Sequence, residues 1–200
     1  MNLKEYHQVK DRTYLDYCYY LQKKYDIPKS PYFTKKWVKT KGLSRTSEGL
    51  FIHHIYEDHA IRLGDPIYAC HNPYQWQMPE NLAYCDFLEH LFLHILICEY
   101  PSPEHNKNEI VGVGGVVNFL VPELNDVYSG FEPKLRWKQN CYNAVIMDKD
   151  VFFELVKRFK HNGDSAIRLY EDRLYRSYNE SFELWSAEKD KDIISVLKEL

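Results

Sequence analysis

The chain has 200 residues, of which 44% are hydrophobic and 28% charged, and its formal net charge is −3. This length fits one globular unit with a sizeable core, and the weakly acidic balance disfavours wholesale non-specific binding to nucleic acid. No apolar run reaches the ~18 residues that a membrane-spanning helix needs, and Lys4, Glu5, His7 and Lys10 interrupt any apolar core of a signal peptide. We therefore expect a cytoplasmic protein that has no membrane partner.

The cysteines give no sign of a disulfide framework or a zinc ribbon. Their number is odd, and they are scattered without a C-x-x-C pair. We expect reduced thiols, most of them buried. The five are Cys18, Cys70, Cys85, Cys98 and Cys141.

The N-terminal region predicts one amphipathic helix over residues 3–25, ended by Ile27-Pro28. Its apolar side carries Tyr14, Leu15, Cys18 and Leu21.

A basic connector follows this helix. Residues 22–46 contain eight basic side chains and one acid, whereas residues 49–104 contain eight acids and one basic residue. The lysines of the connector could neutralise the backbone phosphates of a nucleic acid while its aromatic rings stack on unpaired bases. It could equally be a solvated loop whose aromatic residues pack inward. The candidate nucleic-acid contacts are Lys35, Lys36, Lys39, Lys41, Arg45 and Trp37, with Tyr32 and Phe33 between them.

Two tandem histidines close an apolar run. His53-His54 follow the apolar residues Leu50, Phe51 and Ile52, which predicts a strand that ends in imidazoles. Asp86 and Glu89 have the spacing of a capping box, which predicts a helix from Phe87 to about Glu99.

The predicted helix carries His90 and His94 at positions i and i+4. This spacing places both imidazoles on one face, where they can bind one metal ion. Two histidines on a mostly apolar helix can also be partly buried and hydrogen-bonded to backbone. The pair alone does not decide between these alternatives.

The whole set of spaced residues resembles the HNH family, also called the ββα-metal or His-Me finger nucleases, and most closely its bacteriocin-type DNase branch. Asn81 precedes His90 by nine positions and His94 follows His90 by four, as in that branch. The resemblance covers residues 49–99, about a quarter of the chain. It implies a first strand from Gly49 to Ile55, a loop, a second strand from Asn81 to Cys85 and then the helix. These elements would surround one divalent ion, such as Mg²⁺, Mn²⁺, Ni²⁺ or Zn²⁺.

Transferred to this sequence, the resemblance implies that His54 is the general base and that His53, His90 and His94 bind the metal. Asn81 would hold the loop that carries the base. A neutral imidazole suits proton abstraction near pH 7, and three nitrogen ligands leave positions for phosphate oxygens. Neighbouring side chains on a regular strand point to opposite faces, so both tandem histidines can serve one site only where the strand ends or bulges.

The connection between His54 and Asn81 is longer than is usual in that family. Its 26 residues, 55–80, are rich in tyrosine, proline and acid. It could be an insertion that contacts substrate, a lid, or the surface of an inactive derivative.

The remaining chain is expected to be mainly helical. The segment from Ile110 to Leu120 is rich in glycine and β-branched residues, which fits a strand or a loop over the core. Its glycine pattern lacks the third glycine and the following helix of a dinucleotide-binding fingerprint, so we expect no cofactor there. Three helices are predicted after this segment. The first begins at Asp148 or Asp150 and ends near Asn162-Gly163. The second runs from Ala166 to about Ser181, and the third from Asp192 to Leu200.

Arginines and tyrosines alternate in the second of these C-terminal helices. They could form a phosphate-contacting face, but an ordinary exposed helix with buried rings is favoured. The residues are Arg168, Tyr170, Arg173, Tyr175, Arg176 and Tyr178.

These features predict an α+β fold in which a ββα-metal motif is embedded in a mainly helical domain. The expected parts are residues 1–48, 49–99 and 100–200. The expected function is that of an HNH-type endonuclease of DNA or RNA, carried by a phage or mobile element. The alternative is a repurposed HNH-like protein that binds nucleic acid or a protein partner, such as a phage inhibitor of a host defence nuclease, because an acidic surface can mimic nucleic acid. A purely structural zinc site is a third interpretation, and it leaves the tandem pair and Asn81 without a role.

Overall fold

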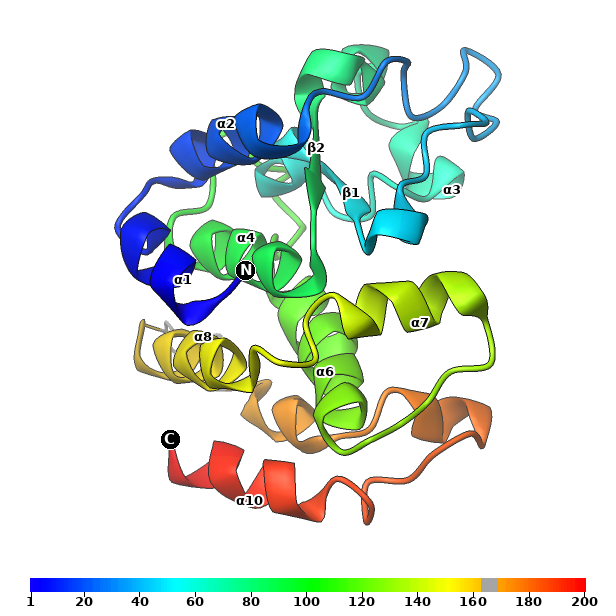
Figure 1. Cartoon of the computed structure of the whole chain (residues 1–200). Helices are drawn as coiled ribbons and strands as arrows, with labels where there is room; N and C mark the ends of the chain where they lie inside the picture. Colours follow the sequence, from blue (N-terminus) through cyan, green and yellow to red (C-terminus); the bar gives the residue numbers. More distant parts are fainter. Residues whose placement is uncertain (163–168) are drawn as a thin grey trace.

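A small two-stranded antiparallel sheet lies in the upper half of a helix-rich protein as drawn in Figure 1. This computed structural model describes residues 1–162 and 169–200. The sheet pairs β1 (Phe51–His54) with β2 (Leu82–Cys85), so that Phe51 lies opposite Cys85 and His54 opposite Leu82. The mixed α+β class predicted from the sequence is therefore confirmed.

Helices are the main regular elements of the described chain. They are α1 (Leu3–Val9), α2 (Tyr14–Tyr25), α3 (Pro66–Ala69), α4 (Phe87–Glu99), α5 (Val113–Gly115), α6 (Val121–Tyr128), α7 (Arg136–Asn143), α8 (Lys149–Asn162) and α10 (Lys191–Glu199). Short 3₁₀ turns are η1 (Thr46–Glu48), η2 (Ile55–Asp58), η3 (Tyr74–Gln77), η4 (Pro79–Asn81), η6 (Glu171–Tyr175) and η7 (Asn179–Phe182), and η5 (Val116–Leu120) is a π-helical turn.

Helix α4 forms the core of the protein. Its apolar residues are buried all around the helix, as expected for a helix with neighbours on every side. The predicted capping box is present, because the Asp86 carboxylate accepts from the Glu89 backbone and the Glu89 carboxylate accepts from the Asp86 backbone. Lys24 on α2 forms an ion pair with Glu89 at 2.7 Å. These contacts fix the start of the helix that carries His90 and His94.

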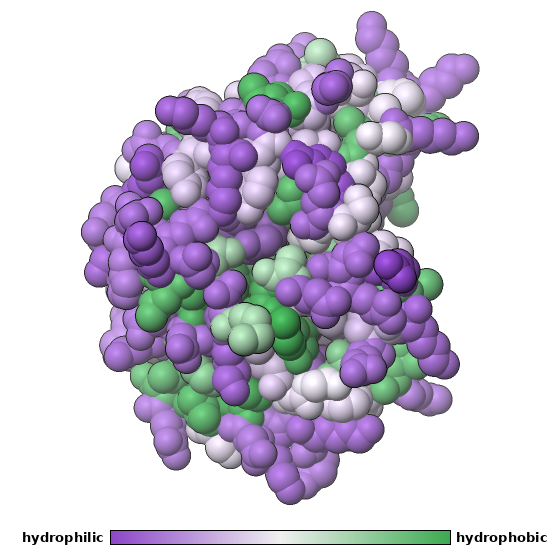
Figure 2. Space-filling view, viewed as in Figure 1, coloured by the Kyte–Doolittle hydropathy of each residue, from purple (hydrophilic) through white to green (hydrophobic). Residues whose placement is uncertain are grey.

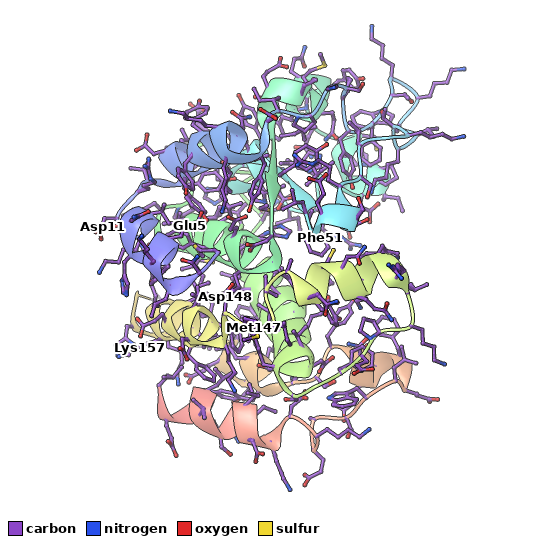
Figure 3. All side chains as sticks on the ribbon, in the orientation of Figure 1. Glu5, Asp11, Phe51, Met147, Asp148 and Lys157 are labelled. Atoms are coloured by element: carbon purple, nitrogen blue, oxygen red, sulfur yellow. The ribbon has the colours of Figure 1, made fainter. Side chains whose placement is uncertain are left out.

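The other helices surround α4. In Figure 1, α2 lies over β2, while α6, α8 and α10 lie on the other side of α4. Figure 3 labels Glu5 on α1 and Lys157 on α8, two helices that pack together. The face drawn in Figure 2 is mostly hydrophilic, with larger hydrophobic groups in its middle and lower part.

The N-terminal region differs from the single helix predicted over residues 3–25. It forms two helices, and Thr13 begins the second by accepting a hydrogen bond from the Asp16 backbone at 3.2 Å. Thr13 thus starts a new helix within an amphipathic pattern that continues from one helix into the next. Of the four residues on the predicted apolar side, Tyr14, Cys18 and Leu21 are buried, whereas Leu15 is 46% exposed.

Two predictions for the second half of the chain were wrong. Residues 113–120 are helical in α5 and η5 rather than a strand or an irregular loop, because Gly112, at φ +79°, turns the chain into a helical path against α4. The helix predicted from Ala166 to Ser181 is absent from residues 169–181, where η6 and η7 are separated by an extended Arg176. The part of that helix over 166–168, including Arg168, lies outside the described residues.

Other predictions are confirmed. Helices α8 and α10 lie where the sequence placed them, and all five cysteines are unpaired, three of them buried. Within the described ranges, none of the helices combines the length and apolar character needed to cross a bilayer.

Candidate metal centre

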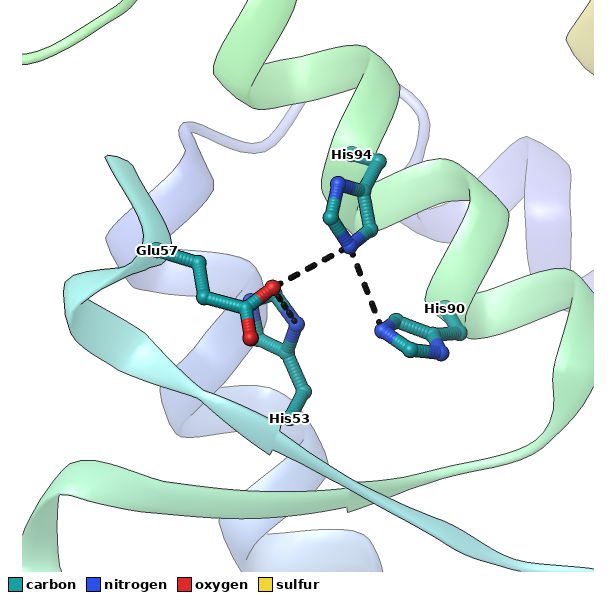
Figure 4. A group of neighbouring side chains, drawn as sticks. All are labelled: His53, Glu57, His90 and His94. Atoms are coloured by element: carbon teal, nitrogen blue, oxygen red, sulfur yellow. Dashed lines mark hydrogen bonds and ion pairs between the residues drawn. The ribbon is translucent and has the colours of Figure 1, made fainter. Parts of the chain in front are cut away.

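Four side chains from three elements meet beside the sheet (Figure 4). His53 comes from β1, Glu57 from the turn η2 that follows it, and His90 and His94 from neighbouring turns of α4. One ligand atom from each residue lies within 4.8 Å of the other three. The cluster could therefore hold a metal ion, and three of its members are the ligands expected from the sequence.

The spacing of these atoms suits one ion. Nε2 of His94 lies 3.2 Å from Nε2 of His90 and 3.2 Å from Oε2 of Glu57, and Nδ1 of His53 lies 3.5 Å from the same oxygen. Bonds of 2.0–2.1 Å to a tetrahedral zinc ion place its ligand atoms about 3.3 Å apart. The three measured separations are close to this value.

Tyr14 determines which nitrogen of His53 carries the proton. The Tyr14 hydroxyl donates to the Ile55 carbonyl at 2.8 Å and lies 2.7 Å from Nε2 of His53. Because a hydroxyl has one proton, it accepts from Nε2–H of His53. The lone pair of His53 is therefore on Nδ1, which is buried and has no hydrogen-bond partner within the described chain.

Gly112 has the same effect on His94. Nδ1 of His94 donates to the Gly112 carbonyl at 3.2 Å, which leaves the lone pair on Nε2, toward the cluster. Backbone carbonyls commonly orient metal-binding histidines in this way. The lone pairs of His53 and His94 thus both point toward the carboxylate of Glu57.

The chemistry of these side chains fits a cation. Burial lowers the pKa of His53 well below its ordinary value, and burial together with His94 lowers that of His90 to about 3, which favours the neutral form of both rings. Burial alone would raise the pKa of Glu57, but its interactions with the surrounding histidines lower it. Imidazole nitrogens beside a carboxylate are ligands that a metal ion can use, so these residues could hold one.

His54 lies beside the cluster but faces a different set of residues. Its ring packs on the Tyr32 ring, with centroids 4.6 Å apart, and its Nε2 lies 3.0 Å from Oε1 of Gln77. The Gln77 amide nitrogen donates to the Leu63 carbonyl, so Oε1 accepts from Nε2–H of His54. The lone pair is then on Nδ1 of His54, and this atom lies 3.7 Å from Oε1 of Glu57.

The position of His54 suits a proton acceptor. Its Nδ1 is buried and has no hydrogen-bond partner in the described ranges, and burial lowers the pKa of this ring. The strand ends at His54, which is the condition under which two neighbouring histidines can reach one site.

Asn81 holds the turn that contacts His54. Its side-chain amide donates to the Gln75 carbonyl at 2.8 Å, within η3, and Gln77 belongs to the same turn. The connection 55–80 thus contributes directly to the site, because it supplies both Glu57 and Gln77.

A cavity of about 550 Å³ opens at the cluster. His54, Glu57, His90 and His94 all line it, and Arg62 is the basic residue of the described lining. The candidate base and three of the four candidate metal ligands therefore line one cavity.

The basic connector reaches this site through Tyr32. Nζ of Lys39 lies over the Tyr32 ring, 4.7 Å from its centroid, and this ring also contacts His54. Tyr32 and Phe33 are buried, and Trp37 packs its ring against Phe33 and Tyr74. The aromatic residues therefore pack inward, which leaves the four lysines as exposed candidates: Lys35, Lys36, Lys39 and Lys41.

Arg45 is occupied within the protein. Its guanidinium forms an ion pair with Glu48 and donates to the Tyr25 carbonyl. These contacts use three of its five N–H donors, and its expected role in nucleic-acid binding stays a prediction.

Sequence reasoning missed Glu57, Gln77 and the glycines of α5. The H-H-x-x-E spacing is a weak signal for Glu57, because it brings a carboxylate back to the tandem histidines only if a helical turn follows the strand. The role of Gly112 depends on a contact with α4 that has no sequence signature.

No family model, no curated protein and no solved structure matches this chain.

Proposed function

We propose that the protein is a metal-dependent endonuclease of the HNH type that hydrolyses phosphodiester bonds in nucleic acid. One observation supports this most strongly: His54, whose Nδ1 has no hydrogen-bond partner among the described residues, lines the same cavity as Glu57, His90 and His94. A candidate base next to a candidate metal centre is the arrangement that hydrolysis of a phosphodiester requires.

The residues of the chain have separate tasks in this proposal. His53, Glu57, His90 and His94 would hold the ion, which supplies Lewis-acid stabilisation of charge on the phosphate. His54 takes a proton from water at Nδ1, and Gln77 keeps that nitrogen unprotonated by accepting from Nε2–H. Asn81 keeps Gln77 in place through η3.

The donor set indicates which ions would bind well. Three imidazoles suit zinc, nickel and similar transition metals, whereas magnesium prefers oxygen ligands. Manganese, like magnesium, prefers oxygen ligands, so among the ions expected from the sequence we favour Zn²⁺ or Ni²⁺ over Mn²⁺ and Mg²⁺.

A second candidate is a closed, non-catalytic metal site in a protein that binds nucleic acid or a protein partner. Glu57 favours this alternative, because a fourth protein ligand completes a tetrahedron, as in structural zinc sites. Catalysis would require the carboxylate to move away or the ion to accept more ligands.

An assay of nicking can separate the two candidates. Plasmid DNA and structured RNA are incubated with the protein and Mg²⁺, Mn²⁺, Ni²⁺ or Zn²⁺ in turn, with EDTA as the control. We expect cleavage with at least one transition metal, and loss of cleavage in His90→Ala and His94→Ala. If no substrate is cut with any ion while calorimetry still detects one bound ion, the closed-site alternative holds.

A further inference from the structure

A row of aromatic and basic side chains begins at the metal cavity and continues along η5 to the C-terminal turns. We propose that this row, formed by Phe119, Arg173, Arg176, Tyr178 and Phe182 and called here the aromatic track, binds an unpaired nucleic-acid strand and leads it to the metal centre. The inference rests on the proposed nuclease function, because it names the substrate class of that site.

Asn118 connects the cavities along this path. It lines the 550 Å³ cavity at the metal cluster, a second of about 160 Å³ and a third of about 330 Å³. Arg173 lines the second cavity, where its guanidinium donates to the Asn118 side chain at 2.8 Å. Arg176 lines the third. The path from the metal site therefore passes two arginines.

Aromatic rings lie beside these arginines. Phe119 is 49% exposed and Phe182 is 56% exposed, and the ring of Tyr178 lies between them, 6.3 Å from Phe119 and 5.5 Å from Phe182. Phe119 also lines the metal cavity, so the row starts at the site itself. Half-exposed phenylalanine rings have no role in the core, but each offers a face on which a base can stack.

The charge of this path favours an anionic strand. The second and third cavities have no carboxylate among their described lining residues. Arginines interleaved with exposed rings are typical of grooves for single strands, which track the phosphates electrostatically and stack successive bases. A duplex keeps its bases stacked within the helix and cannot use the rings of Phe119 and Phe182 in this way.

The test measures binding in EDTA, where cleavage cannot occur. Fluorescence anisotropy with labelled oligothymidylate, oligouridylate and a blunt DNA duplex compares wild type with Phe119→Leu/Arg176→Gln. The control is Trp137→Leu/Arg136→Gln on α7, because Trp137 is 44% exposed and neither residue lines the three cavities. Circular dichroism and thermal melting verify folding, and Arg176→Gln alone, at an exposed position, replaces the double variant if it does not fold.

We expect wild type to bind a single strand more tightly than the duplex. The track variant should lose roughly 5- to 100-fold in that affinity, the loss expected for one base-stacking ring, while the control changes little. Removing one arginine should also lower the slope of log affinity against log salt by about 0.7. Tighter binding to the duplex, equal losses in both variants, or no binding by wild type would overturn the proposal. Cleavage assays play no part in this result, so its failure is distinct from failure of the nuclease proposal.

Discussion

Gly115 lies so close to His94 that no side chain fits between them. A Cβ atom on Gly115 would be 2.4 Å from Nδ1 of the imidazole and 2.5 Å from Cε1. The short helix α5 can therefore pack against the metal-binding face of α4 only with glycine at this position. The sequence pattern of the glycines gave no indication of this role.

Gly115→Ala should weaken metal binding by pushing the His94 ring out of position. We expect a loss of roughly 10- to 100-fold in affinity, as for other changes that misorient a metal-binding histidine. Calorimetric titration with Zn²⁺ or Ni²⁺ measures it.

Gly114→Ala is the matched control. Its Cβ would meet only the Asn118 amide at 3.7 Å, which is an ordinary contact, and alanine favours a helical backbone. Equal metal affinities in the two variants would show that the close approach of Gly115 is unimportant.

Replacement of His54 should remove catalysis without removing the metal. In His54→Ala we expect cleavage to fall ~10²-fold or more, because a general base is lost, while metal affinity stays near that of wild type. Single-turnover cleavage and calorimetry on the same preparation give both quantities. Wild-type cleavage rates in this variant would contradict the assignment of the base.

The lysines of the connector should contribute phosphate contacts near His54. Reversing Lys35, Lys36, Lys39 and Lys41 to glutamate should weaken binding to nucleic acid of any sequence and flatten its salt dependence, by about 0.7–0.9 in slope for each lost contact. Metal affinity should not change.

A matched control reverses four exposed lysines on other parts of the chain: Lys107, Lys149, Lys157 and Lys191. If both quadruple variants bind nucleic acid equally well at two salt concentrations, the connector is only a solvated loop.

Asp126 should make the stability of the C-terminal part depend on pH. Burial and its hydrogen bond with Asp190 raise the pKa of Asp126 to about 7. A carboxyl group with a raised pKa in the folded state stabilises the fold fully below its unfolded pKa, and this contribution is lost as the pH rises through the folded pKa. The free energy of unfolding should therefore fall between about pH 4 and pH 7, by roughly 1.4 kcal/mol for each unit between the two pKa values.

Asp126→Asn should remove this part of the pH dependence. The amide can donate to Asp190 at every pH, and its oxygen can still accept from the Asn179 backbone, which now donates to Asp126 at 2.8 Å. Urea unfolding at several pH values measures the slope. An unchanged slope in the variant would assign the pH dependence to other groups.

Local signals in the sequence predicted the framework of the site well. The capping box at Asp86 and the end of β1 at His54 are both where the pattern placed them. Both depend on interactions between residues that are close together in the chain, so a short stretch of sequence is enough to predict them. The same holds for the i and i+4 pair on α4.

The parts that could not be predicted depend on tertiary contacts. Glu57 joins the cluster because η2 bends back under β1, and Gly115 matters only because α5 packs on His94. The described part of the Arg-Tyr stretch is not a continuous helix, because η6 ends at Tyr175 and Asn125 on α6 donates to the Leu174 and Arg176 carbonyls. Hydrogen bonds from a distant helix replaced those that a local helix would have made.

The proposed function requires that the cluster of His53, Glu57, His90 and His94 is a catalytic metal centre. The most direct test titrates metal-free protein with Zn²⁺, Ni²⁺ or Mn²⁺ and records both bound ion and single-turnover cleavage at every point. We predict that cleavage rises with occupancy and reaches a plateau at about one ion per chain, and that Glu57→Gln shifts the curve to higher metal concentration. Full occupancy by one ion without cleavage of any DNA or RNA substrate would contradict the claim.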